Sequence, residues 1–150
     1  MSARLLAPRP GSASLVARIA LGLVMLPHGA QHALGLFGGY GFRGTLGWMT
    51  HTLGFPTVLA AAAIIVELVA PFALLAGFGA RLAALGITGL MIGAISTHAP
   101  NGFFMNWFGA LPAGQEGFEY HLIAIALAAV VIVEGSGVLS VDRLLERRLA

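Results

Sequence analysis

The chain has no cysteine, no lysine and few charged residues of any kind. Without cysteine it cannot by itself form a disulfide, a thiolate metal site or an iron–sulfur cluster. Only 9% of its 150 residues are charged, whereas a soluble globular domain carries about 25%. Its eight cations are scattered arginines, too few to follow a phosphate backbone. The composition therefore excludes a soluble enzyme, a disordered chain and a nucleic-acid-binding protein.

The chain contains long apolar runs. The chain is 58% hydrophobic, and a membrane-spanning helix needs about 20 mostly apolar residues. Four segments meet this requirement: 15–36, 57–77, 82–98 and 119–137. We therefore expect an all-α integral membrane protein, a single domain over residues 1–150 whose spans form a four-helix bundle. Gly89 and Gly93 form a GxxxG pair, which favours packing within the bundle over formation of a homo-oligomer.

The arginines are distributed unequally between the two ends of the predicted spans. Seven lie at one end, Arg4, Arg9, Arg18, Arg81, Arg143, Arg147 and Arg148, and only Arg43 lies at the other. Because cytoplasmic loops carry the excess of positive charge, both termini are expected in the cytoplasm. Arg18 falls about one turn inside the first span, and we expect its guanidinium to extend outward to the lipid phosphates.

The segments between and after the spans are expected at the membrane surfaces. Residues 37–56 and 99–118 form outer loops with apolar and aromatic side chains, which indicate either interfacial anchoring or a lid over a cavity. Gly135-Ser136-Gly137 predicts the end of the fourth helix. Ser140 then predicts the cap of a short amphipathic helix through Leu149, which would lie on the inner surface.

Polar side chains inside the spans gather toward the outer side. Ionisable groups there are costly and usually face the protein interior or a cavity. The candidate ligand-binding residues are His28, Gln31, Glu67, His98, Glu119 and His121. We expect His28 and Glu67 to face each other inside the bundle, because their depths are similar. His32 shares a helical face with His28 at a spacing of four residues.

Three chemistries could use this cluster. Imidazole and carboxylate groups bind zinc, copper or iron. Two histidines could hold a haem between helices. Histidine and glutamate could instead hydrogen-bond the carbonyl or hydroxyl groups of a quinone. Motifs for hydrolytic zinc or nucleotide chemistry, namely HExxH, the P-loop and GxGxxG, do not occur in the sequence.

Short strings along the chain resemble the DoxX family in their order and spacing. They are His28-Gly29-Ala30-Gln31 with Phe37-Gly38-Gly39, Leu53-Gly54-Phe55-Pro56, Glu67, the link from Leu75 to Arg81, His98 with Asn101-Gly102-Phe103-Phe104, Glu119-Tyr120, and Gly135-Ser136-Gly137 with Ser140-Val141-Asp142. The resemblance covers about residues 15–142. One departure is His32, where the family usually has lysine.

The resemblance implies a four-helix protein of the bacterial plasma (inner) membrane that is associated with oxidoreductase systems. Relatives include a subunit of thiosulfate:quinone oxidoreductase and members of oxidative-stress complexes. The first hypothesis is therefore a quinone-binding subunit that needs an oxidoreductase partner protein and is inactive alone. The second is a non-catalytic membrane anchor or scaffold for a redox or stress complex. The third is a carrier of a metal or small molecule.

Overall fold

The computed structural model describes residues 11–112 and 114–149, and its regular structure within them is entirely helical. Six α-helices occur in these residues: α1 (Ser12–Gly29), α2 (Gly41–His51), α3 (Thr57–Ala76), α4 (Ala80–His98), α5 (Glu119–Glu134) and α6 (Val141–Leu149). A π-helical segment, η2 (Ala30–Leu34), extends α1, and a 3₁₀ turn, η3 (Ala99–Asn101), extends α4. The predicted all-α class is confirmed. Arg4 and Arg9, which entered the orientation argument, lie outside the described residues.

Three helical stretches are long and apolar enough to cross a membrane: Ser12–Leu34, Thr57–Ala76 and Ala80–Asn101. They match the first three predicted spans to within a few residues, so the chain is a multi-pass membrane protein. The fourth predicted span corresponds to α5, which is shorter, with 16 residues. At 1.5 Å per residue, this helix is about 24 Å long.

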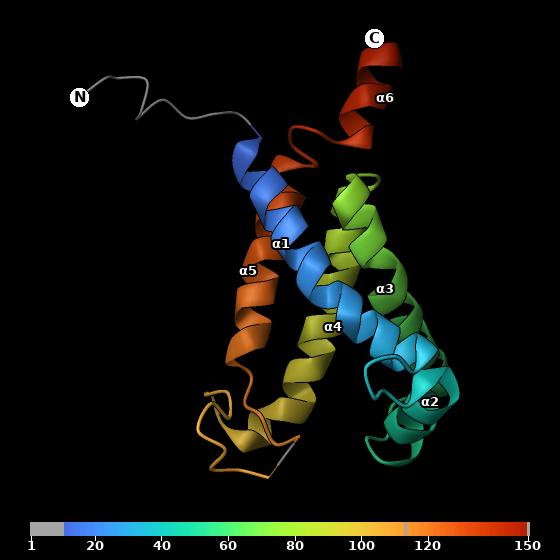
Figure 1. Cartoon of the computed structure of the whole chain (residues 1–150), viewed down its shortest axis with the longest axis vertical. Coiled ribbons are helices and arrows are strands. Elements are labelled where there is room, and N and C mark those ends of the chain that lie inside the picture. The colour runs from blue at the N-terminus through green and yellow to red at the C-terminus, as the bar shows by residue number, and fades with distance from the viewer. Residues whose placement is uncertain (1–10, 113, 150) are drawn as a thin grey trace, which may run out of the picture.

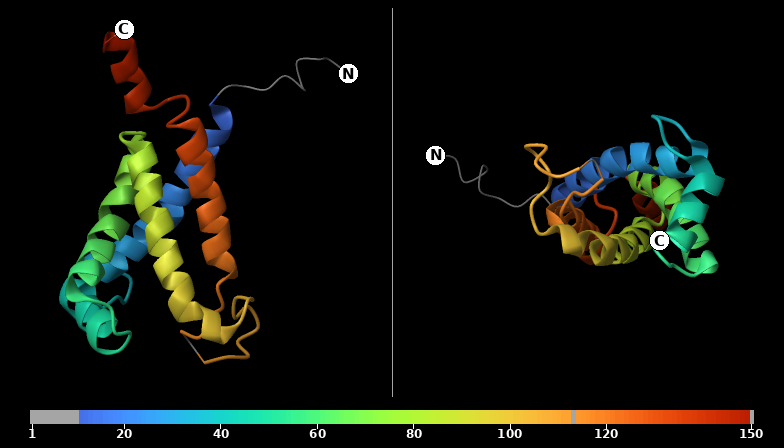
Figure 2. Two further views of the ribbon diagram at one scale, coloured as in Figure 1. Left: turned by 180° about the vertical axis from the view of Figure 1, so that it is seen from behind. Right: turned by 90° about the horizontal axis from the view of Figure 1, so that it is seen from below.

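The four long helices pack in a ring. α1 contacts α3 and α5, and α4 contacts the same two helices from the other side. Figures 1 and 2 show α6 at one end of this arrangement, with α2 and the loop of residues 99–118 at the opposite end. We call these the α6 end and the loop end. The core contains small alanines together with Leu21, Met25, Leu74 and Ile87, each no more than 1% exposed. Such small side chains allow close helix contact where lipid provides no hydrophobic driving force.

Arg18 is buried at the α6 end and does not extend to the lipid phosphates, so this prediction was wrong. Its side chain is 1% exposed, and its guanidinium donates to five carbonyl oxygens, those of Leu74, Leu75, Ser136, Val138 and Leu139, at distances of 2.6–3.2 Å. The last carbonyls of a helix lack intrahelical partners, and the linker after α5 has no helical hydrogen bonding of its own. These five carbonyl acceptors hold the cation inside the protein, and all but that of Leu74, which also accepts the N–H of Gly77, depend on Arg18 for a donor.

The predicted end of the fourth helix and the predicted cap are both confirmed. α5 ends at Glu134, where Gly135 takes a positive φ of 82°. Ser140 Oγ accepts the N–H of Arg143 at 3.3 Å, as expected for the N-cap of α6. The exposed face of α6 carries Val141, Leu144 and Leu145.

Asp142, in the first turn of α6, caps the start of α4. Its two carboxylate oxygens accept the N–H groups of Gly79 at 2.9 Å and Ala80 at 3.3 Å, and Ser136 Oγ also donates to it. Burial alone would raise the pKa of Asp142. The three hydrogen bonds and the nearby Arg18 charge outweigh burial and lower this pKa below its ordinary value of 3.8. The ionised carboxylate therefore ties α6 to α4.

Candidate functional site

Glu67 is a buried carboxylate near the middle of α3, as its position in the sequence predicts. Its side chain is paired with His32, whose Nδ1 lies 2.5 Å from Glu67 Oε2. Within residues 11–112 and 114–149 this is the one salt bridge. We expected His28 and Glu67 to face each other inside the bundle; in the structure His28 is exposed, and the residue that faces Glu67 is His32. The structure thus identifies a polar pair between α3 and η2.

The π-helical segment explains why His32 and not His28 reaches Glu67. Pro27 has no N–H to continue the helical ladder, and the N–H of Gly35 reaches the carbonyl of Ala30, five residues earlier. The wider turn changes the register after Gly29. As a result, His28 and His32 do not share a neighbour as the four-residue spacing predicts: His28 contacts Tyr120 of α5, and His32 contacts Glu67 of α3.

Gly29 allows α1 to approach α3 closely at this level. A Cβ atom built on Gly29 would lie 2.3 Å from the carbonyl oxygen of Glu67, where ordinary contact begins at 3.4 Å. The backbone φ of Gly29 is −60°, which any residue adopts. Space, and not conformational freedom, therefore requires glycine here.

Four rings from three helices form a row at the loop end, which we call the ring row: His28, Tyr120, His121 and His98. Neighbouring ring centroids along the row are 6.3, 5.7 and 4.8 Å apart. The row therefore connects α1, just before the segment that carries His32, to α5 and α4.

His121 carries an unsatisfied polar atom. The residue is 7% exposed, and its Nδ1 has no hydrogen-bond partner among the described residues. Buried polar atoms are nearly always hydrogen-bonded, so such an atom calls for an explanation. His28, the first ring of the row, is exposed. The row thus combines a buried orphan nitrogen with an imidazole that is accessible from outside the bundle.

The remaining predicted site residues hold the loops in shape. Glu119 Oε2 accepts the N–H of Met105 at 3.1 Å and the Nε1–H of Trp107 at 3.4 Å. Gln31 Nε2 donates to the carbonyl of Phe37 at 3.2 Å. His98 Nδ1 donates to the carbonyl of Glu116 at 2.8 Å, which leaves the Nε2 of a neutral His98 as an acceptor. Glu119 and Gln31 therefore have structural partners. His98 both hydrogen-bonds the loop and contacts His121 in the ring row.

Two site residues, His32 and Tyr120, are absent from the predicted set. The resemblance noted in the sequence implies a lysine at the position of His32, and this was a signal, because a cation there implies a nearby acid such as Glu67. Tyr120 lies between two predicted residues, Glu119 and His121. Its ring contact with His28 could not be seen in the sequence, because it depends on which faces of α1 and α5 meet.

Two further observations concern the metal-binding and small-molecule alternatives raised by the sequence. In the described part of the chain, no group of three or more His, Cys, Asp or Glu side chains lies together as a metal site. Two cavities, of about 510 and 740 Å³, lie at the α6 end, away from the ring row.

Comparison with known proteins gives one match. The DoxX family model matches residues 13–107, more than half of the chain. The matched segment includes His28, His32, Glu67 and His98, and ends before Tyr120 and His121. No curated protein and no solved structure matches the chain.

Proposed function

Since this chain belongs to the DoxX family, we propose that it is a membrane subunit of an oxidoreductase system. The site between the Glu67–His32 pair and the ring row binds the polar head of a quinone or a similar small ligand. The observation that carries the proposal is the Glu67–His32 pair, with 2.5 Å between Nδ1 and Oε2. It lies beside a row of rings that includes His121, whose Nδ1 has no partner among the described residues.

The pair can hold a proton in two ways. Either His32 Nδ1–H donates to the carboxylate, or the protonated carboxyl of Glu67 donates to a neutral imidazole. A pair that can hold the proton in either way can give a proton to a ligand oxygen or take one from it. A bound quinone would supply the two-electron chemistry, and the chain would supply position and proton exchange.

The residues fit such a head group. His121 Nδ1, buried and without a protein partner, can donate to a ligand carbonyl or accept from a ligand hydroxyl, depending on its tautomer. His28 is exposed and lies 6.3 Å, between ring centroids, from Tyr120. A ligand that enters from the bilayer would therefore meet His28 first and His121 last.

The chain needs a partner to complete a redox reaction. It has no cysteine and no nucleotide-binding motif, so the electron donor reaches the site through an oxidoreductase partner protein. In the arrangement we propose, α5 is the fourth span of a four-helix bundle, because residues 121–133 carry no Asp, Glu, Lys or Arg. The protein lies in a bacterial plasma membrane with both termini in the cytoplasm.

A binding experiment tests this proposal. The full chain in neutral lipid nanodiscs is titrated with a short-tailed benzoquinone, and binding is measured by isothermal titration calorimetry. Glu67→Gln keeps a hydrogen-bonding side chain beside His32 but removes the exchangeable proton, and should weaken binding by about tenfold or more, the value of one charged hydrogen bond. Glu116→Gln is the matched control at the same end, and its affinity should equal that of the parent. Equal binding by parent and Glu67→Gln would refute the site.

One observation favours the scaffold alternative. Phe104, Trp107 and Phe108 are 72%, 73% and 97% exposed on the loop held by Glu119. A shaped loop with exposed aromatic side chains suits contact with a partner or with the membrane interface. If the parent chain binds no quinone but purifies with a stable partner enzyme, and Phe108→Ser releases that enzyme, the scaffold function is supported instead.

A further inference from the structure

The α6 end contains a cavity that the proposed function does not use. It is a half-open depression with a volume of about 510 Å³, between the C-terminal residue of α3, the linker 138–140 and α6. Its lining is largely aliphatic, with Ala76, Val138, Leu139, Val141 and Leu144. Ligand cavities in proteins typically measure about 300–1,000 Å³. The cavity is therefore large enough for part of a small molecule or an alkyl chain.

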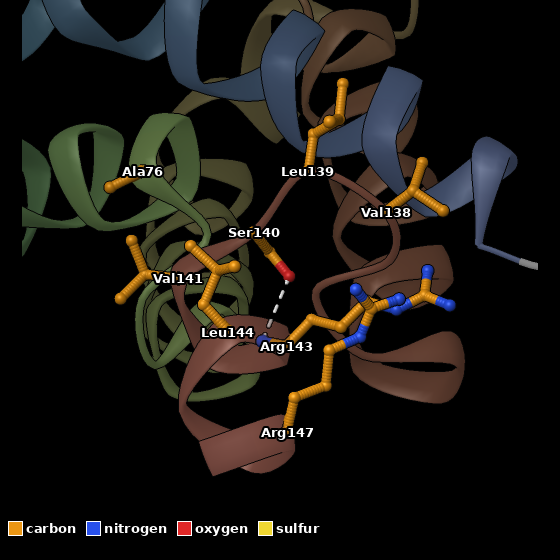
Figure 3. A pocket seen from close by; sticks show the side chains of 8 residues that line it. All are labelled: Ala76, Val138, Leu139, Ser140, Val141, Arg143, Leu144 and Arg147. Carbon is orange, nitrogen blue, oxygen red and sulfur yellow. Dashed lines mark hydrogen bonds between the residues drawn. The ribbon is translucent and has the colours of Figure 1, made fainter.

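Two arginines give this apolar cavity a charged rim. Arg143 and Arg147 both line it and share one face of α6, since they are four residues apart. Figure 3 shows Ala76, Val141 and Leu144 on one side of Ser140, and the arginine side chains on the other. In the described part of the chain, neither guanidinium forms a salt bridge. Two like charges at this spacing repel each other, and an anion placed between them removes the repulsion.

The second cavity, of about 740 Å³, has a more acidic lining than the first and is therefore less favourable for an anion. It lies along the same helix but is lined by three carboxylates, Glu134, Asp142 and Glu146, which outnumber its two arginines, Arg81 and Arg143. Those carboxylates repel an anion. The first cavity has no acidic residue in its lining.

Leu139 lies at the first cavity with its side chain 84% exposed and its backbone φ at +54°. Only a few per cent of residues other than glycine have a positive φ. Arg18 holds this backbone through the Leu139 carbonyl at 2.6 Å. The conformation keeps a large apolar side chain at the cavity edge, where an alkyl chain would cover it.

We propose that this cavity is a binding site for an anionic phospholipid. The phosphate group lies between Arg143 and Arg147, and one acyl chain lies along Val141, Leu144 and Leu139. The site is separate from the ring row at the loop end, so the proposal stands whether or not a quinone binds there. Membrane proteins attract anionic lipids through arginines near the membrane surface, and here an apolar cavity adjoins the two charges.

Native mass spectrometry of the detergent-solubilised full chain tests this. Phosphatidylglycerol and phosphatidylcholine with identical acyl chains are titrated separately, and phosphatidylglycerol should bind more tightly. The double variant Arg143→Gln, Arg147→Gln should lose about 25-fold in affinity for phosphatidylglycerol, since each interfacial arginine contributes roughly fivefold. Arg148→Gln removes the same charge from α6 outside the cavity and should change affinity little.

The cavity itself is tested by filling it. Ala76 is exposed at the end of α3, so Ala76→Phe fills the cavity without disturbing the core, and should reduce lipid binding. Ala62→Phe, at another exposed position of α3, is its control. Circular dichroism confirms that each variant is folded.

Any of four results would overturn the proposal. The first is equal affinity for the two lipids. The second is a loss with Arg148→Gln as large as that of the double variant. The third is parental affinity in Ala76→Phe. The fourth is competition by the deacylated headgroup, glycerophosphoglycerol, as effective as by the intact lipid, which would mean a simple anion site.

Discussion

The contact between α1 and α3 at Gly29 can be tested by adding one methyl group. In Gly29→Ala the new Cβ would lie 2.3 Å from the Glu67 carbonyl oxygen and 2.7 Å from the Leu68 Cα. Both are backbone atoms, so no side chain can rotate away. To reach an ordinary contact of 3.4 Å, α1 and α3 must separate by about 1 Å at this level.

Two opposing effects decide the sign of the change in stability. Alanine is the better helix former and would contribute up to about 1 kcal/mol. Overpacking of a close contact costs about 1–3 kcal/mol. Because the obstacle is backbone, we expect the upper part of that range and a net destabilisation of about 1–2 kcal/mol. The separation also lengthens the 2.5 Å contact between His32 and Glu67, so ligand binding should weaken as well.

Equilibrium unfolding in mixed micelles, followed by far-UV circular dichroism, measures the change. Gly89→Ala in α4 is the control, because nothing lies within 4 Å of its added Cβ. This control should be neutral or slightly more stable than the parent. A Gly29→Ala chain as stable as the Gly89→Ala chain would show that α1 and α3 do not meet at Gly29, and the packing argument would be refuted.

Three further predictions concern charge and orientation. Arg18→Met leaves four carbonyls without a donor, since only that of Leu74 also accepts the N–H of Gly77, and should cost about 3–5 kcal/mol of unfolding free energy. The exposed Arg148→Met should stay within about 0.5 kcal/mol; a small loss for Arg18 would indicate that it reaches the headgroups. Because the folded-state pKa of Asp142 is lowered, its stabilisation is present above pH 3.8 and is lost as the pH falls through the folded-state value. Asp142→Asn should thus be less stable than the parent at pH 7 by about 1 kcal/mol, with the difference disappearing in acid titrations of the unfolding midpoint. A single cysteine at the exposed Gln115 should react with an impermeant thiol reagent added outside intact cells, and one at the exposed Glu146 should not. The reverse pattern would invert the proposed orientation.

Local signals predicted most of the helices. Gly135 and Ser140 mark a helix end and a helix start because their effects act within one turn of the chain. The apolar runs place α1, α3 and α4 to within a few residues, since their length is set by membrane thickness. The same reasoning placed Glu67 inside a span, where the structure has it.

Contacts between distant residues could not be predicted in this way. The sequence shows Arg18 near a membrane surface, but not the carbonyls more than 50 residues away that surround it. The spacing of His28 and His32 predicts one shared face, because it assumes an unbroken α-helix. The π-helical turn changes the register between them. Which partner each histidine meets then depends on how α1 packs against Glu67 and Leu68 of α3.

The burial of Arg18 also constrains the order in which this protein can be assembled. Ser136, Val138 and Leu139 supply three of its five acceptors, and they follow it in the chain by 118, 120 and 121 residues. During synthesis α1 therefore enters the membrane before most of the carbonyl oxygens that accept hydrogen bonds from its guanidinium have been made. Its final depth can be fixed only after α5 and the linker behind it have been made. A nascent chain arrested before Ser136 should thus hold α1 loosely, open to extraction or to quality-control proteases, although the whole of that helix is already present.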